Sequence, residues 1–178
     1  MTDQPWAGPA GTTRSADALR TGTTRELSEF IAGLDAADIP PDVVHQAKRC
    51  LIDWLGVTLA GSAHASAETL SAVSGMLGTE RGATVLGRDR DAALLLAVLT
   101  NGYLAHVLDY DDTYNPARTT VHGSAPVWPV VLGLGERHHI DGRRALAAFV
   151  AGFETEIRVA LAAGPSHYEA GWHVTGTA

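Results

Sequence analysis

The stretch RDAALLLAVLTNGYLAHVLDY, from Arg90 to Tyr110, is apolar on nearly every side when it is drawn as a helix. A helix with apolar residues all round is normally buried by the elements that pack on it. We therefore expect these residues to form a buried central helix, around which the rest of the domain is built.

Helical patterns lie on both sides of this stretch. Apolar residues recur at helical spacing, and Pro, Ser and Asp residues begin the segments while Gly residues end them. The expected helices cover residues 23–35, 41–61, 66–77, 124–139 and 141–164. The piece GATVLG is strand-like but too short to carry a sheet. The chain is therefore expected to be an all-α helical bundle.

Composition limits the class of protein. The chain has 178 residues, a formal net charge of -7 and 46% hydrophobic residues, which fits one globular domain. Its Lys and Arg residues are scattered, so we expect no nucleic-acid partner. No apolar run is long enough for a membrane span, and the start of the chain lacks the apolar region of a signal peptide. We expect a cytoplasmic protein with a flexible tail at residues 1–22 and an ordered domain at residues 23–178.

An unusual group of acids follows the central apolar stretch, at Asp109, Asp111, Asp112 and Thr113. If the helix continues through them, Asp109, Asp112 and Thr113 share one face and Asp111 points elsewhere. Acids at a helix C-terminus oppose the helix dipole. This mismatch favours a functional site over a solvated helix end, although the second interpretation stays open.

Two histidines stand in loops that precede a helix start. His122 is followed by Gly123 and by Ser124, which is a candidate N-cap, and His173 is followed by small residues. An anion could therefore meet an imidazole and free backbone N–H groups together. By contrast, we expect His106 to pack or cap within its helix. Two tryptophans and the single cysteine are expected in the core, namely Trp54, Trp128 and Cys50.

A metal-dependent alternative rests on the segment DDTYN. It resembles the aspartate-rich motifs of magnesium-dependent isoprenoid synthases, and oxygen ligands suit Mg²⁺. Those motifs usually carry an acid where Asn115 stands, and the chain has no second acidic motif. A magnesium-dependent isoprenoid-type enzyme is therefore kept only as an alternative, and no metal site is expected.

Several separated motifs together resemble the MmgE/PrpD family, from about residue 24 to residue 178. They are LIDWLGVTLAG, NGYLAHVLDYDDT, HGSAPVWPVVLGLGE, AFVAGFETEIRVALA and HYEAGWHVTGTA. The resemblance implies a lyase of the 2-methylcitrate dehydratase or cis-aconitate decarboxylase type, acting on a small polycarboxylate. It also implies a homodimer, no metal and no organic cofactor, and a helical domain followed by a separate lid domain that this chain lacks.

The resemblance also implies site residues. Its catalytic positions fall on Asp109, Thr113, His122 and His173. Substrate-binding positions are expected at His122, Gly123, Ser124, Trp172 and Thr175. The chain departs from the family pattern at Asn115, at Val174 and in the extra residues of ARTTV, which makes the position of His122 the least secure of the four.

Family members are considerably longer than this chain. We therefore expect the 178-residue piece to be incomplete and inactive alone, and to need a complementing C-terminal chain. A different class of function remains open, in which the chain is a catalytically inactive helical module for dimerisation or binding.

Overall fold

The computed structural model describes residues 22–77, 82–89, 91–115 and 120–177. Over these residues it contains eight helices and one two-stranded ladder, which confirms the all-α prediction. The expected tail at residues 1–22 lies outside the described residues, except for Gly22. None of the helices in the described ranges is long and apolar enough to cross a membrane.

Contacts divide the chain into two units, Met1–Gly33 and Leu34–Ala178. The described part of the first unit is helix α1, Thr23–Gly33. The second unit holds the remaining elements, which are α2 (Pro41–Gly61), α3 (Ser66–Leu77), β1 (Ala83–Thr84), β2 (Asp91–Ala92), α4 (Leu94–His106), α5 (Ser124–His138), α6 (Gly142–Ala163), α7 (Pro165–Glu169) and α8 (Val174–Thr177).

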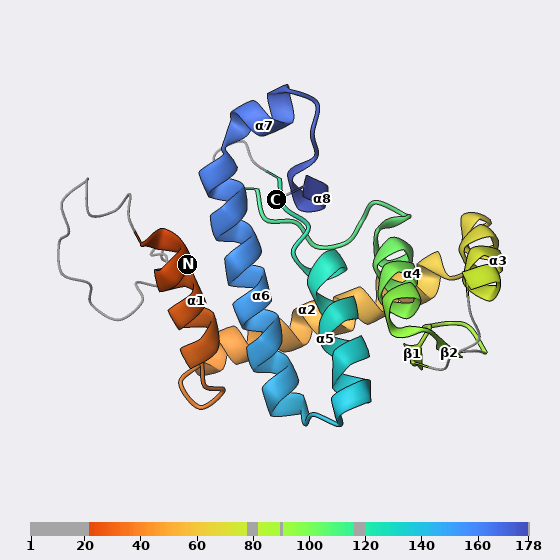
Figure 1. Cartoon of the computed structure of the whole chain (residues 1–178), viewed down its shortest axis with the longest axis horizontal. Coiled ribbons are helices and arrows are strands. Elements are labelled where there is room, and N and C mark those ends of the chain that lie inside the picture. The colour runs from red at the N-terminus through yellow and green to blue at the C-terminus, as the bar shows by residue number, and fades with distance from the viewer. Residues whose placement is uncertain (1–21, 78–81, 90, 116–119, 178) are drawn as a thin grey trace. The chain divides into compact units, whose positions relative to one another are not determined.

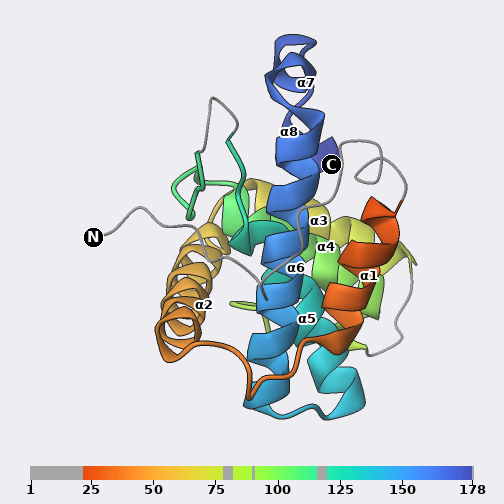
Figure 2. The same cartoon turned by 90° about the vertical axis from the view of Figure 1, so that its left-hand side faces the viewer.

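In the second unit α2 runs crosswise to α5 and α6, and α4 packs against both α2 and α5 (Figure 1). The view in Figure 2 looks along α2 and shows α7 above the end of α6, with α8 returning beside it. The strands β1 and β2 pair antiparallel next to α4 and α5.

The main core lies where α2, α4, α5 and α6 meet. Trp54 and Trp128 are fully buried in it, and the ring of Trp128 stacks on Phe149 at 4.2 Å. Cys50 is also buried here, so the three core predictions are confirmed. The backbones of α2 and α4 approach closely, since a Cβ added at Gly61 would lie 2.0 Å from the carbonyl oxygen of Leu104. Only glycine fits this crossing.

The central apolar stretch departs from its prediction in three respects. Its first described residues, Asp91–Ala92, form β2, and α4 begins only at Leu94. Helix α4 ends at His106, before the acids, and is not buried all round. Leu95 and Leu99 are 82% and 60% exposed, and with Tyr103 they form an apolar stripe along one face. Of the three, Tyr103 reaches α3, where its hydroxyl donates to that of Ser66 at 2.6 Å, and elsewhere α4 packs on α2 and α5.

Candidate functional site

The site is built on the described residues of the connection between α4 and α5, residues 107–115 and 120–123, which we call the site loop. The chain turns sharply after α4 because Asp109 adopts a left-handed backbone conformation, with φ of 54°. Such a conformation is uncommon outside glycine but is tolerated best by Asn and Asp. Further on, Tyr114 and Val121 exchange backbone hydrogen bonds of 2.8 and 2.9 Å, which closes the loop.

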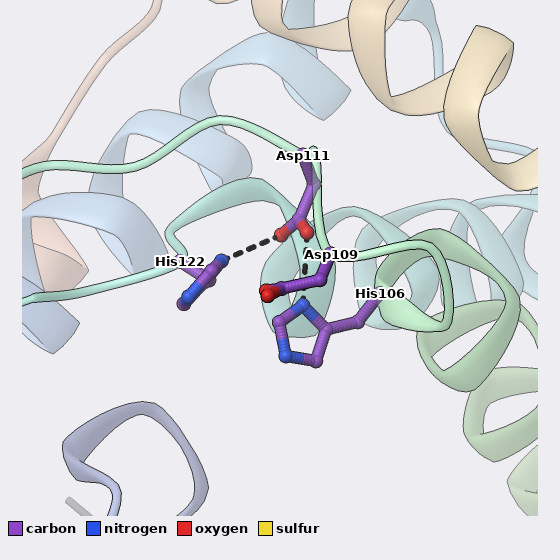
Figure 3. Close-up of side chains that lie close together, drawn as sticks. All are labelled: His106, Asp109, Asp111 and His122. Carbon is purple, nitrogen blue, oxygen red and sulfur yellow. Dashed lines mark hydrogen bonds and ion pairs between the residues drawn. The ribbon is translucent and has the colours of Figure 1, made fainter.

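Asp111 lies at the centre of this loop, with a side chain that is 0% exposed. One carboxylate oxygen is 2.8 Å from Nδ1 of His106, and the other is 3.0 Å from Nδ1 of His122 (Figure 3). A single acid therefore joins the last residue of α4 to His122, which lies two positions before the start of α5. Its two hydrogen bonds offset the cost of burying the carboxylate.

A third imidazole completes the group. The ring of His173 lies 5.4 Å from that of His122 and 6.5 Å from that of His106, while the latter two are 4.4 Å apart. His173 is carried by the short α7–α8 segment. That segment is held by Val174, which is fully buried against Val121 and Ala160. The expected proximity of His122 and His173 is thus present in the structure.

The other two residues given catalytic roles by the resemblance lie on the site loop. Asp109 is exposed, and its carboxylate belongs to a cluster with His106, Asp111 and His122 whose donor atoms lie within 4.8 Å of one another. Thr113 is exposed on the loop. The predicted common face of Asp109, Asp112 and Thr113 does not form, because α4 ends before them.

Asp112 has a different role from the one expected. It accepts hydrogen bonds from the backbone N–H of Ser124 at 3.1 Å and from its hydroxyl at 2.8 Å. The prediction that Ser124 is the N-cap is therefore wrong, since Gly123 holds that position and the carboxylate of Asp112 caps the helix from the loop. Ser124 is 0% exposed, and this N–H group is already occupied by an acid of the protein.

The remaining predicted substrate-binding residues divide into buried and exposed ones. Gly123 is buried, and a Cβ added there would lie 2.0 Å from the ring of Phe153. Packing against this ring therefore requires glycine. The hydroxyl oxygen of Thr175 accepts the backbone N–H of His122 at 3.0 Å, which ties the two histidine segments together. Trp172 is 59% exposed and lies next to His173 in the chain.

Sequence reasoning missed His106 and Asp111 as members of the site. It assigned His106 to packing or capping, and it placed Asp111 away from the face shared by the other acids. Both predictions assumed a helix that continues past His106. The positive φ of Asp109 reverses the chain and brings Asp111 back under the end of α4. The available signal was the local one, namely acids placed where the helix dipole disfavours them.

The donor set bears on the metal alternative. Two imidazoles and two carboxylates suit a divalent transition metal better than Mg²⁺, which prefers oxygen ligands. Both oxygens of Asp111 already bind imidazoles, and both oxygens of Asp112 bind Ser124. Two of the carboxylates in the aspartate-rich segment are therefore engaged within the protein.

Burial and neighbouring charges shift the pKa of two groups near the site. Desolvation, followed by the charges of His122 and His106, lowers the pKa of His173, while Asp109 acts in the opposite direction. On α6, desolvation and then the charge of Asp112 raise the pKa of Glu156 to about 8. Both carboxyl oxygens of Glu156 are buried without a hydrogen-bond partner.

A groove opens beside the imidazoles. It has a volume of about 420 Å³, and its lining includes one of the three imidazoles, that of His106, together with Thr175 and apolar residues such as Leu99 and Pro129. This volume is within the range of small-molecule sites. The arrangement can therefore offer imidazoles for proton transfer or anion binding at the edge of a space that holds a small organic acid.

Comparisons with known proteins identify relatives of the chain. A cis-aconitate decarboxylase-like protein of Aspergillus oryzae is 28% identical over 84% of this chain and 32% of its own length. The cis-aconitate decarboxylase of Mus musculus is 29% identical over 76% of this chain and 28% of its own length. The corresponding enzyme of Aspergillus terreus is 25% identical over 91% and 34%. The chain thus spans about one third of the length of these relatives.

The family model described as the MmgE/PrpD N-terminal domain matches residues 25–178, which is most of the chain. The match includes the site loop, the three imidazoles and every helix of the second unit. The chain therefore belongs to the MmgE/PrpD family.

Proposed function

We propose that this chain is the histidine-bearing part of a lyase that acts on a small polycarboxylate. The reaction is either decarboxylation of a cis-aconitate-like acid or dehydration of a 2-methylcitrate-like hydroxy acid. The observation that carries the proposal is the gathering of three imidazoles, with ring centroids no more than 6.5 Å apart, one of which, His106, lines a groove. The names of the relatives, which are cis-aconitate decarboxylases, support the same class.

In this proposal His173 transfers the proton and His122 binds a substrate carboxylate. In decarboxylation the bond to one carboxyl group breaks, CO₂ leaves, and the electron pair left on carbon takes a proton from the imidazole. In dehydration a base removes a proton from carbon while hydroxide departs and is protonated to water. The lowered pKa of His173 suits the base of the dehydration, because a neutral imidazole near neutral pH can accept the carbon proton. In decarboxylation the ring must first take up the proton that it then gives to carbon.

Asp109 and Thr113 would assist from the site loop, by orienting a histidine or by hydrogen bonding to a substrate hydroxyl. The exposed position of both residues leaves them accessible to a ligand. Asp112 and Ser124 are less suited to that role, because their side chains are already hydrogen bonded to each other.

A polyanionic substrate needs a locally positive site in a chain of net charge -7. The three imidazoles supply part of that charge when they are protonated. We propose that the remainder comes from a complementing chain segment or from the second copy in a homodimer, and that the enzyme works in the cytoplasm without an organic cofactor or a metal. On this view residues 23–178 form one helical domain of the whole enzyme, and this chain alone is inactive.

The test is the His173→Gln substitution in the longest natural form of the protein, assayed for CO₂ release from cis-aconitate and for water loss from 2-methylcitrate. We expect turnover to fall by about 10²–10⁴-fold, the usual contribution of a general acid–base group. The control is His45→Gln on the exposed face of α2, which should leave turnover unchanged.

Near-normal turnover in the His173 variant would reject the assignment. If the unaltered protein turns over neither substrate but associates with a longer relative, the inactive binding module becomes the better description. A requirement for added divalent metal would favour the metal-dependent alternative.

A further inference from the structure

We infer that Asp111 is a positioning residue that keeps the protons of His106 and His122 on Nδ1, so that Nε2 of each ring serves the substrate. His106 thereby joins the site as a third working imidazole. The inference rests on the proposed function for the use of these nitrogens, but the placement of the protons depends only on the contacts around Asp111.

The first step concerns the chemistry of the carboxylate. An ionised carboxylate has acceptor oxygens and no donor, whereas a neutral imidazole has one donor nitrogen and one acceptor nitrogen. The two oxygens of Asp111 face Nδ1 of His106 at 2.8 Å and Nδ1 of His122 at 3.0 Å. Both contacts are hydrogen bonds only if each Nδ1 carries the proton. Nε2 of each ring is then the nitrogen left for the substrate: it accepts a proton when the ring is neutral, and it donates to a substrate carboxylate once it holds that proton.

The orientation of the two rings decides which nitrogen of each one a ligand can reach. In Figure 3 the second ring nitrogen of each histidine points away from Asp111. The side chain of His106 is 44% exposed and lines the groove, whereas that of His122 is 8% exposed and faces the other two rings. The imidazole of His106 is therefore open to a ligand from the groove side, whereas that of His122 is buried beside the other two rings.

The third step concerns the loop that holds the acid. Asp111 stands on the site loop between the left-handed turn at Asp109 and the closed pair Tyr114–Val121. Because its side chain is 0% exposed, no water competes for its oxygens. A buried acid that orients an imidazole and fixes its tautomer is a known requirement of histidine catalysis. Here one acid meets this requirement for two rings.

The experiment uses ring-nitrogen NMR on the protein labelled with ¹⁵N-histidine, with assignments from His106→Gln and His122→Gln. In the unaltered protein at a pH where the rings are neutral, we expect both to carry the proton on Nδ1. In Asp111→Asn the side chain offers one oxygen and one NH₂ group. It can accept from one ring only, so the other ring must move its proton to Nε2.

We expect the same substitution to reduce kcat by about 10²–10⁴-fold with a smaller change in KM, because ring geometry and tautomer fail while the groove stays intact. The matched control is Asp141→Asn, which alters an exposed helix-capping acid on α6 and should leave the tautomers and turnover unchanged.

A proton on Nε2 of either ring in the unaltered protein would overturn the inference, and this measurement needs no variant to fold. Turnover of Asp111→Asn within threefold of the unaltered protein would overturn it as well. If both rings carry the proton on Nδ1 and the protein lacks lyase activity, the positioning role stands and the proposed function fails.

Discussion

Two regions of the molecule bury carboxyl groups in opposite ways. On the site loop, all four oxygens of Asp111 and Asp112 have hydrogen-bond partners, supplied by two imidazoles and by the first residue of α5. On α6, both oxygens of Glu156 are buried with no partner. The loop thus supplies a partner for every oxygen of these two acids, whereas burial without a partner favours the protonated form of Glu156.

The difference shows that a loop can turn its acids toward hydrogen-bond donors, whereas a helix fixes the direction of each side chain. The left-handed turn at Asp109 lets the site loop carry its acids to donors on two separate helices. A residue in the middle of a helix such as α6 has its direction fixed by the helical repeat. The carboxyl group of Glu156 therefore cannot turn toward a hydrogen-bond donor. Its burial, together with the nearby charge of Asp112, raises its pKa to about 8.

The largest expected effect comes from breaking the loop side of this comparison with Asp112→Ala. The substitution leaves the buried N–H and hydroxyl of Ser124 without their acceptor, so we expect a loss of about 2–3 kcal/mol in the free energy of unfolding. Urea unfolding measures it. Asp112→Asn, which keeps one acceptor oxygen, should lose less than half as much. A loss below about 0.5 kcal/mol for the alanine variant would mean that another group caps α5.

A second test concerns the helix side, with Glu156→Gln. Because the pKa of Glu156 is raised from 4.5 to about 8, the folded state holds more protons than the unfolded state between these values. The wild-type protein should therefore lose stability as the pH rises through this window. The glutamine variant cannot ionise, so we expect it to be more stable than wild type by about 2 kcal/mol at pH ~9, after allowance for partial solvent screening. Urea unfolding at several pH values measures it.

The control for this test is Glu154→Gln on the same helix, where the acid is paired with Arg158. That variant should show no gain at high pH. Parallel stability curves for wild type and Glu156→Gln from pH ~5 to ~9 would contradict the assignment of a protonated acid at this position.

The smallest effect concerns His173, whose pKa is lowered from 6.5 by desolvation and by the two neighbouring imidazoles. Its NMR titration midpoint in the folded protein should lie below that of a short peptide containing GWHVT. Asp109→Asn should lower the midpoint further, because Asp109 opposes the shift. Since the unfolded state binds this proton more readily, the contribution of His173 to stability should be lost as the pH falls below about 6.5. A midpoint equal to that of the peptide would argue against the three-ring cluster in solution.

The sequence predicted the helices well because they depend on local signals. The apolar spacing and the flanking Pro, Asp and Gly residues placed α2 and α6 at the observed bounds, and α5 begins where Ser124 was expected to start it. The tryptophans of the core followed from the same patterns. The family resemblance supplied the residues His122 and His173, which composition and spacing identified only as possible anion-binding loops.

The arrangement inside the site loop could not be predicted in the same way. It depends on a backbone conformation at Asp109 that few residues adopt, and on contacts between segments distant in sequence. One change of direction exchanged the roles of the acids, so that Asp111 joined the imidazoles and Asp112 capped α5. Hydrophobic periodicity carries no information about such a turn.

The contact between His122 and Thr175 has a consequence for how the protein responds to a ligand. The segment that carries His173 rests on a small apolar cluster, separate from the main core around Trp128, and on this hydrogen bond between the backbone N–H of His122 and the hydroxyl of Thr175. Segments with few buried contacts open more readily than the domain as a whole. A small acid that bridges the two imidazoles would tether this segment, so that occupancy of the pocket and closure of the C-terminal segment become a single linked equilibrium.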